Sequence, residues 1–279
     1  MLRNLNEIED YSIGASDGLI GHVKDGYFDQ HDWVIRYLVV DTGSWLTSRK
    51  VLISPFAIGK PDWDGRRLPV SLTRQQVKDS PPTDDDTPLT RQHEMRTLDY
   101  YGFPFYWGGG GLWGAGMFPS MMLTGDFMLP PPAIQEAAHA AELAEQHGSC
   151  DELHLRSCKM LESFQIHARD GEIGHVQGML IDEDTWAVRY LIIETGNWWL
   201  GQRVLIAPKW ITDVNWNESW VVVNLSRQAI QTAPVYDPSA RFGRTQEIAI
   251  HQHYGRKGYW STEAEQQALA SVCREEVPA

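Results

Sequence analysis

Two acidic residues follow apolar runs at equivalent places in the chain. Asp41 begins the segment Asp41-Thr42-Gly43-Ser44, and Glu194 begins Glu194-Thr195-Gly196-Asn197. Two Asp-Thr-Gly loops can bring two carboxylates together so that they share a proton and activate water. The second residue here is a glutamate, whose extra methylene moves its carboxylate outward and spoils a symmetric pair. We therefore interpret both segments as strand ends followed by tight turns, in which glycine accepts a positive φ.

Cys150, His154 and Cys158 occur at intervals of four residues. On a helix this spacing would place two thiolates and an imidazole on one face, where they could hold a metal ion. We expect an extended strand here, which would spread the three side chains over about 26 Å. A fourth ligand is not evident. The sequence therefore predicts no metal site, and no cofactor is expected.

An arginine followed by a tyrosine lies inside an apolar run at two places, as Arg36-Tyr37 and Arg189-Tyr190. An arginine in an apolar strand must find acidic partners or reach solvent. We expect a structural ion pair rather than a catalytic group. It would tie each strand to the helical tail that ends its half of the repeated sequence. The candidate acidic partners are Asp29, Asp41 and Glu94, and their equivalents Asp182, Glu194 and Glu247.

Other side chains are candidates for packing or contact. His22 and His175 each follow a glycine, and we expect strand residues half-covered by the neighbouring hairpin. Aromatic rings bury large areas, so the repeated tryptophans are expected in cores or at a seam between two similar halves. These tryptophans are Trp33, Trp45, Trp63, Trp107, Trp186, Trp198, Trp216 and Trp260.

An uncharged stretch follows the first half of the chain and contains Trp113, Met121 and Met122. Methionine is flexible and adapts to surfaces of varied shape. We therefore expect residues 103–129 to face a partner. The glycines and prolines of this stretch argue against a membrane-spanning helix.

These residues belong to an internal repeat. Residues 1–107 align with residues 154–260 at an offset of 153 without a gap, and 37 of the 107 positions are identical. A repeat of this size fixes the architecture before any other feature. We expect copy one with a helical tail at 1–107, a Gly/Pro/Met-rich connector with a short helix at 108–153, copy two with its tail at 154–260, and a C-terminal helix at 261–279.

Short strand-like runs separated by turn signals fill the first part of each copy, a pattern typical of small barrels and sandwiches. An Asp-Gly pair predicts a hairpin before the first long run. Hydroxyl residues that precede short polar segments predict helix N-caps, and Gly102 and Gly255 predict helix ends. In copy one we expect strands at 20–28, 33–40, 50–54 and 68–72, and helices at 73–77 and 94–101.

The net charge of the 279-residue chain is −13, which disfavours nucleic acid as a partner because phosphates need clustered lysine and arginine. The chain has three cysteines and no shared disulfide pattern between the copies, as expected in a reducing compartment. No apolar stretch of signal-peptide length begins the sequence. We expect a cytoplasmic location.

The runs Asp170-Gly171-Glu172-Ile173-Gly174-His175-Val176 and Thr185-Trp186-Ala187-Val188-Arg189-Tyr190-Leu191 resemble the PRC-barrel family. That family includes the cytoplasmic barrel of the photosynthetic reaction-centre H subunit and the C-terminal barrel of a ribosome maturation factor. The resemblance covers about 1–81 and 154–234. It implies a mainly β fold of two tandem small barrels with short helices, related by a pseudo-two-fold axis.

The resemblance implies a non-enzymatic docking or scaffold protein with a protein partner that the sequence does not name. Three alternatives stay open. They are a peripheral component of a photosynthetic or other membrane complex, a ribosome-assembly accessory, and an aspartic-protease-like enzyme that uses Asp41 and Glu194. A homo-oligomer also stays open.

Overall fold

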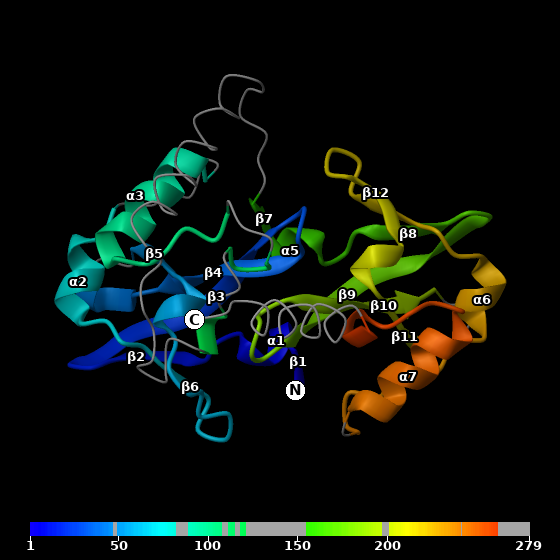
Figure 1. Ribbon diagram of the computed structural model, residues 1–279, viewed down its shortest axis with the longest axis horizontal. Coiled ribbons are helices and arrows are strands. Elements are labelled where there is room, and N and C mark those ends of the chain that lie inside the picture. Colours follow the sequence, from blue (N-terminus) through cyan, green and yellow to red (C-terminus); the bar gives the residue numbers. More distant parts are fainter. Residues whose placement is uncertain are drawn as a thin grey trace, which may run out of the picture. The chain divides into compact units, whose positions relative to one another are not determined.

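The computed structural model describes residues 1–46, 49–81, 89–107, 111–114, 118–120, 155–196, 201–240 and 242–261. Strands dominate, and the helices are short (Figure 1). The expectation of a mainly β fold is therefore confirmed. Three predicted contact residues lie outside the described residues, namely Met121, Met122 and Trp198.

The first sheet consists of the four strands expected for copy one and two more, β2 and β7 (Leu155–Ser157). Its core strands are β3 (Gly18–Asp29), β4 (Val34–Asp41) and β5 (Lys50–Ile53), which pair antiparallel. β2 (Ser12–Ala15) pairs antiparallel with β3 and parallel with β6 (Arg67–Pro69). The order is β5-β4-β3-β2-β6.

The second sheet repeats this arrangement. Its order is β11-β10-β9-β8-β13-β12, in which β13 pairs parallel with β8, as β6 does with β2. The described pairings thus leave each sheet with two ends. The strands are β8 (Gln165–Ala168), β9 (Gly171–Asp182), β10 (Val188–Thr195), β11 (Arg203–Ile206), β12 (Ile211–Asn215) and β13 (Trp220–Val223).

Helices follow the strands of each copy where the capping residues predicted them. α2 (Arg74–Asp79) begins with a capping box between Thr73 and Gln76. α3 (Arg91–Tyr101) ends at Gly102, whose φ of 70° is the left-handed conformation that glycine favours at this position. The other helices are α1 (Leu5–Ile8), α5 (Cys158–Leu161), α6 (Arg227–Gln231) and α7 (Arg244–His253).

A repeated glycine marks a close approach between neighbouring strands in both sheets. A Cβ atom added to Gly21 of β3 would lie 1.9 Å from the carbonyl oxygen of Asp41, at the end of β4. The equivalent atom on Gly174 would lie 2.0 Å from the carbonyl oxygen of Glu194. No residue with a side chain fits in that space, which accounts for glycine at both positions.

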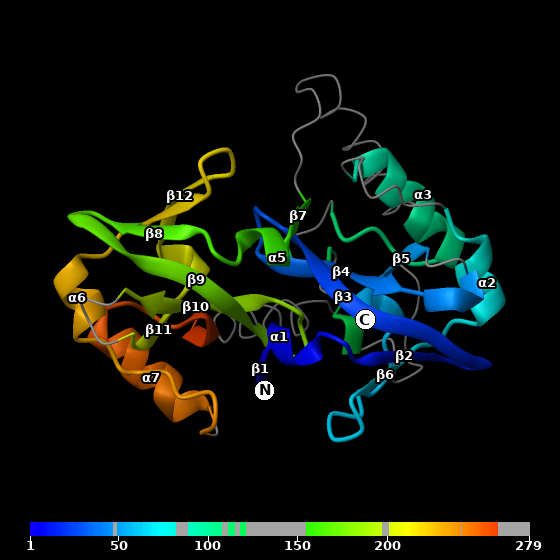
Figure 2. The same cartoon turned by 180° about the vertical axis from the view of Figure 1, so that it is seen from behind.

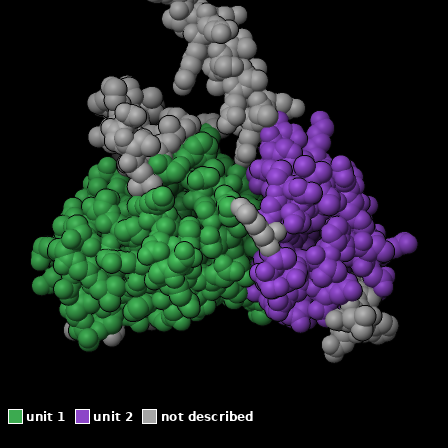
Figure 3. Space-filling view, turned by 90° about the horizontal axis from the view of Figure 1, so that it is seen from below, with its two compact units in different colours: residues 1–164, 178–191 green, residues 165–177, 192–279 purple. Residues whose placement is uncertain are grey.

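The chain divides into two compact units, coloured separately in Figure 3. Unit 1 contains residues 1–164 and 178–191, and unit 2 contains residues 165–177 and 192–279. The units therefore do not coincide with the sequence copies. The first residues of copy two and the hairpin that joins β9 to β10 belong to unit 1.

Candidate functional site

Each copy contributes its first strand to the sheet of the other copy. β1 (Leu2–Asn4) pairs antiparallel with β9, with Leu2 opposite Asp182 and Asn4 opposite Leu180. β7 (Leu155–Ser157) lies beside β3, as Figures 1 and 2 show, with Leu155 opposite Asp29. With an offset of 153 between the copies, the two sets of pairs are equivalent residue for residue. All of these residues lie in unit 1.

Two tryptophans extend this exchange of strands. Trp33 and Trp186 have φ angles of 56° and 57°, a left-handed conformation that is rare for a bulky residue. The carbonyl of Trp186 accepts a hydrogen bond from Ile35 N at 2.9 Å, and the carbonyl of Trp33 accepts one from Val188 N at 2.7 Å. Between these two bonds, Val34 lies directly opposite its own equivalent, Ala187.

The turns before the tryptophans explain how the strained conformation is held. The Asp29 carboxylate accepts a hydrogen bond from His31 N at 2.8 Å, and that of Asp182 accepts one from Asp184 N at 3.0 Å. Trp33 N and Trp186 N then close each turn onto the carbonyls of these aspartates. A strained residue costs on the order of 1–3 kcal/mol and persists only where surrounding contacts fix it.

We call this set of contacts the junction. Its apolar centre is buried, as Phe28, Val34, Ile181 and Trp186 show, and Phe28 stacks on Trp33 at 5.0 Å between ring centroids. Its edges are polar, where Arg3 forms an ion pair with Glu183 at 2.7 Å and Arg156 donates to Gln30 at 3.0 Å. The junction consists of Leu2–Asn4, 28–35, Leu155–Ser157 and 180–188.

Arg36 is a fully buried charge next to the junction. Its guanidinium donates to Asp32 at 3.0 Å and lies 3.5 Å from the Asp29 carboxylate. Its face covers the ring of Tyr106 at 3.9 Å, and its other amino group donates to the carbonyl of Leu112. The expected partner Asp29 is therefore confirmed, and Asp32 is a second partner. Both aspartates belong to the turn before β4, so this ion pair does not join the strand to the tail as expected, and the tail meets Arg36 through the ring of Tyr106.

Arg189 occupies the equivalent position in copy two. It lies 3.5 Å from the Asp182 carboxylate and donates to Thr185 Oγ1 at 3.4 Å. The pairing with the aspartate that begins the turn is thus common to both copies. The Arg36 cluster has a second carboxylate because copy one carries Asp32 where copy two carries Thr185.

The tail of each copy is attached through a buried glutamate. Glu94 accepts a hydrogen bond from the Tyr106 hydroxyl and pairs with Arg91 at 3.3 Å. Burial, followed by the charge of Glu94, raises the pKa of Tyr106 well above its ordinary value, so this hydroxyl stays protonated and donates. The same contacts recur in copy two, where Glu247 accepts from Tyr259 at 2.8 Å and pairs with Arg244 at 3.0 Å.

The expectation that residues 103–129 face a partner fails for the aromatic residue that motivated it most. Trp113 is fully buried, packs edge-on against Phe56 at 4.7 Å and donates to the carbonyl of Thr185 at 2.6 Å. Tyr106 is buried as well. An apolar ring here fills a gap beside Arg36 and is not available to a partner.

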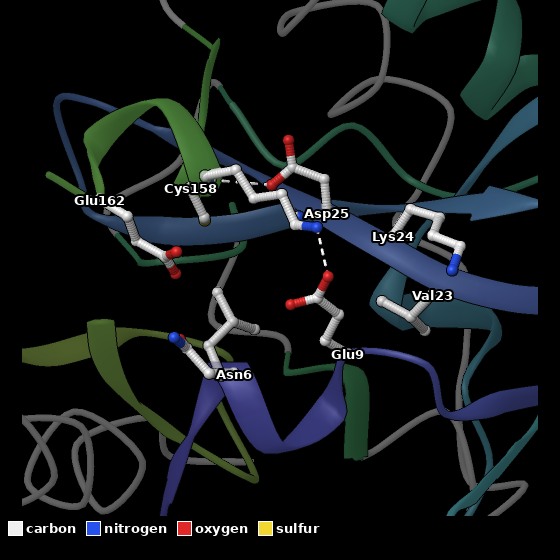
Figure 4. Close-up of a pocket in the computed structure, with 10 residues that line it drawn as sticks. Asn6, Glu9, Val23, Lys24, Asp25, Cys158 and Glu162 are labelled. Carbon is white, nitrogen blue, oxygen red and sulfur yellow. Dashed lines mark hydrogen bonds and ion pairs between the residues drawn. The ribbon is translucent and has the colours of Figure 1, made fainter. Parts of the chain in front are cut away.

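A small pocket lies beside the junction within unit 1. Equivalent residues of the two copies line it, since Glu9 corresponds to Glu162 and Leu5 corresponds to Cys158. Figure 4 shows the side chains of Glu9, Asp25 and Glu162 around it. Its volume of about 20 Å³ is enough for about one water molecule and too small for an organic substrate.

Asp25 of β3 lies in this pocket and holds β7 and α5 against β3. It accepts hydrogen bonds from Ser157 Oγ at 2.6 Å and from Lys159 N at 3.1 Å. Burial raises its pKa despite these bonds, and burial together with the charges of Glu9 and Asp25 raises the pKa of Glu162. Burial also raises the pKa of the Cys158 thiol well above its usual value, so this cysteine is an inert core residue.

The raised pKa of Asp25 predicts an unusual pH dependence. A carboxyl group whose pKa is higher in the folded state contributes most to stability below its unfolded-state value, here 3.8, and loses that contribution as the pH rises through the folded-state pKa. The stability of the wild type relative to Asp25→Asn should therefore increase as the pH falls from 8 to 4. Urea unfolding of both proteins measures this difference.

Asp10 supplies the control for that experiment. A hydrogen bond from Lys24 lowers the pKa of Asp10, so the wild type should lose stability relative to Asp10→Asn as the pH falls below about 5 and through the unfolded-state value of 3.8. Opposite slopes for the two variants are expected. A flat profile for Asp25→Asn, or the same slope as for Asp10→Asn, would contradict the assigned direction.

The remaining candidates have local structural contacts. The Asp41 carboxylate accepts a hydrogen bond from Gly43 N at 2.8 Å, and Gly43 has a φ of 61°, as the interpretation of a strand end and turn predicts. The equivalent Gly196 lacks the positive φ expected of it. Glu194 accepts from the Gln177 side chain at 2.9 Å. His22 and His175 are exposed strand residues rather than half-covered ones. Trp45 donates to the carbonyl of Ile20.

The tail tryptophans contact arginines of their own copies. The guanidinium of Arg91 lies 4.3 Å from the ring of Trp107, and that of Arg244 lies 4.4 Å from the ring of Trp260. Each tail is therefore fixed to the helix that precedes it. Trp33 and Trp186, by contrast, lie where the two copies pair with each other.

Within the described ranges, no three His, Cys, Asp or Glu side chains are placed to hold a metal ion. Cys150 and His154 lie outside these ranges, and Cys158 begins α5 instead of lying in the strand expected for it. No helix among the described residues is both long and apolar enough to cross a membrane.

No family model matches the chain. Among curated proteins, the chain is similar to an uncharacterised protein of Deinococcus radiodurans, with 37% identity over 82 residues. The matched segment is 27% of this chain and 29% of that protein, so this chain covers less than two thirds of the relative. This likeness assigns neither a family nor an activity.

Proposed function

We propose that the protein is a non-enzymatic docking protein built from two tandem PRC-type barrels. The proposal rests on what the repeated polar side chains bind. Arg36 and Arg189 bind the aspartates of their own hairpins, and Glu94 and Glu247 bind the tyrosines of their own tails. Side chains preserved in both copies thus join elements of the fold, which is the requirement of a rigid docking module.

The barrel assignment rests on the resemblance of both copies to the family and on their common strand order. Strands of the two sheets follow one another as β5-β4-β3-β2-β6 and as β11-β10-β9-β8-β13, so these five strands have their equivalents in the same places, and β12 is an additional strand of the second sheet.

Two exposed apolar side chains distinguish the copies and are our candidates for partner contact. Leu19 on β3 is 51% exposed where copy two has Glu172, and Met160 on α5 is 55% exposed where copy one has Glu7. Because the other copy has a glutamate at each equivalent position, the fold itself needs no apolar side chain there. Leucine and methionine bring apolar contact that the fold does not use, and the net charge of −13 favours a partner with a basic surface.

Replacing both residues by the glutamate of the other copy tests this function. The double variant Leu19→Glu, Met160→Glu should keep its melting temperature within about 2 °C, because exposed substitutions change stability little. Affinity purification of the tagged full chain, followed by calorimetry with each purified partner, should show at least a tenfold weaker Kd for the variant.

Glu172→Gln is the matched control, because it changes an exposed residue at the position equivalent to Leu19. It should bind as the wild type does. Partners that bind the double variant and the wild type with equal Kd would contradict the proposed surface. Peptide hydrolysis at acidic pH that Asp41→Asn abolishes would contradict the non-enzymatic function.

A further inference from the structure

We propose that the junction is a self-complementary binding surface that also accepts a second copy of this chain, by exchange of halves between two molecules. Copy one of each molecule would then pair with copy two of the other, through the contacts that now close a single chain. The partner is therefore a second molecule of this protein, because the surface is complementary to itself. This inference concerns self-association and does not depend on the docking function.

The reciprocity of the junction is the first observation that supports this. Leu2 faces Asp182 and Leu155 faces Asp29, and each pair becomes the other when 153 is added or subtracted. Val34 faces its own equivalent, Ala187, which therefore marks the local two-fold axis. Contacts in which i meets j and j meets i are those of a symmetric homodimer interface. The tandem chain reproduces such an interface within one molecule.

The incompleteness of each copy is the second observation. Phe28 and Val34 of copy one are fully buried, and Ile181 and Trp186 of copy two are almost fully buried. β7 covers the end of β3, and β1 covers the end of β9, so each copy completes the sheet of the other. A copy without its complement would expose this apolar surface and an unpaired strand edge, which favours pairing with another chain.

Differences between the copies determine which halves pair. Asp25 binds Ser157 and the backbone of Lys159, whereas its equivalent, Gly178, leaves space for Asn6. A Cβ atom on Gly178 would lie 2.9 Å from Asn6 Oδ1. If copy one met another copy one, Asp25 would take the place of Gly178 and crowd Asn6. Unlike halves therefore pair in preference to like halves.

The connector decides how much exchange occurs. Copy one ends at about residue 107, and β7 begins at Leu155. Because the two copies belong to one chain, closure within a molecule is intramolecular, with an effective concentration on the order of millimolar. The closed monomer therefore dominates at micromolar concentration. Exchange should grow roughly in proportion to the protein concentration during refolding and reach about a tenth of the chains at about 100 μM.

Chains that carry one introduced cysteine, beside the buried native Cys158, test the exchange directly. Full-length Val34→Cys and Ala187→Cys proteins, each also carrying Cys150→Ser and Cys273→Ser, are mixed in equal amounts. They are unfolded in urea, refolded at about 10 and about 100 μM, and oxidised. Non-reducing gels and peptide mass spectrometry then measure the disulfide between position 34 of one chain and position 187 of the other.

The expected result is an interchain disulfide between the unlike cysteines that increases about tenfold between the two concentrations and is absent when folded chains are mixed. Each variant refolded alone should give several-fold less disulfide. Val34→Cys mixed with Val235→Cys is the matched control, because Val235 is exposed and lies outside the junction. Interchain disulfide no higher than in this control, in samples whose circular dichroism shows refolding, would overturn the proposal.

Discussion

Arg36→Ala is expected to lower the free energy of unfolding by about 3–5 kcal/mol, because it removes one partner of a buried ion pair and leaves charges behind. Asp29 would remain buried without the guanidinium, and the ring of Tyr106 would lose the cation that covers it at 3.9 Å. For a chain of this size the melting temperature should fall by roughly 2–4 °C per kcal/mol. Urea and thermal unfolding at pH 7 measure both quantities.

Arg36→Lys is the matched control for this experiment. Lysine keeps the positive charge but lacks the planar fork that donates to Asp32 and Leu112 while lying over Tyr106. Its loss of stability should therefore lie between those of the wild type and Arg36→Ala. An alanine variant that loses less than about 1 kcal/mol would show that the cluster contributes as little as a surface ion pair.

Phe28→Ala is expected to have a similarly large effect, about 3–5 kcal/mol, because it opens a cavity in the junction. Phe28 is fully buried, stacks on Trp33 and lies opposite Arg156 of β7. Its loss should loosen β7 and α5 from β3 in addition to lowering the overall stability. Cys158, the first residue of α5, is buried in the wild type and should then react several-fold faster with a thiol reagent.

Leu19→Ala is the control on the same strand, because Leu19 is exposed. Its stability and the labelling rate of Cys158 should match those of the wild type, in a background with Cys150→Ser and Cys273→Ser. If Phe28→Ala lowered the stability but left Cys158 unreactive under native conditions, the attachment of β7 and α5 would not depend on this ring.

Local patterns were sufficient to predict the central strands and the helices that follow them. Apolar runs between turn residues placed β3 and β4 to within a few residues, and Thr73 and Gly102 placed a helix start and a helix end. Asp29 was one of three acidic partners expected for Arg36, because a buried guanidinium requires a carboxylate, but the sequence did not single it out. Such features depend on neighbours along the chain.

The exchange of strands could not be predicted in this way. Leu155–Ser157 and Leu2–Asn4 are short, and nothing in three residues specifies which of two similar sheets they join. The pairing depends on side chains more than a hundred positions away. A signal was nevertheless present, since tryptophan ended the turn at both Trp33 and Trp186, where a flexible residue would be the ordinary choice.

Local sequence patterns also could not predict the surroundings of Trp113 or the presence of the pocket. Trp113 lies in an uncharged stretch without periodicity, so its composition indicated an exposed surface, whereas the ring packs beside Phe56 and Arg36. The carboxylates of Glu9, Asp25 and Glu162 come together only because α1 and α5 both pack beside β3. Tertiary packing, rather than sequence spacing, determines both sites.

An engineered disulfide between Val34 and Ala187 tests the reciprocal junction most directly. These residues form an antiparallel pair flanked by the two hydrogen bonds of the tryptophan carbonyls, an arrangement in which Cα atoms are about 4.5 Å apart. The double variant Val34→Cys, Ala187→Cys, in a chain with a protease site in the connector, should form the disulfide within one molecule and keep its halves linked on a non-reducing gel after cleavage. Halves that separate, in a protein that folds as the wild type does, would contradict the junction.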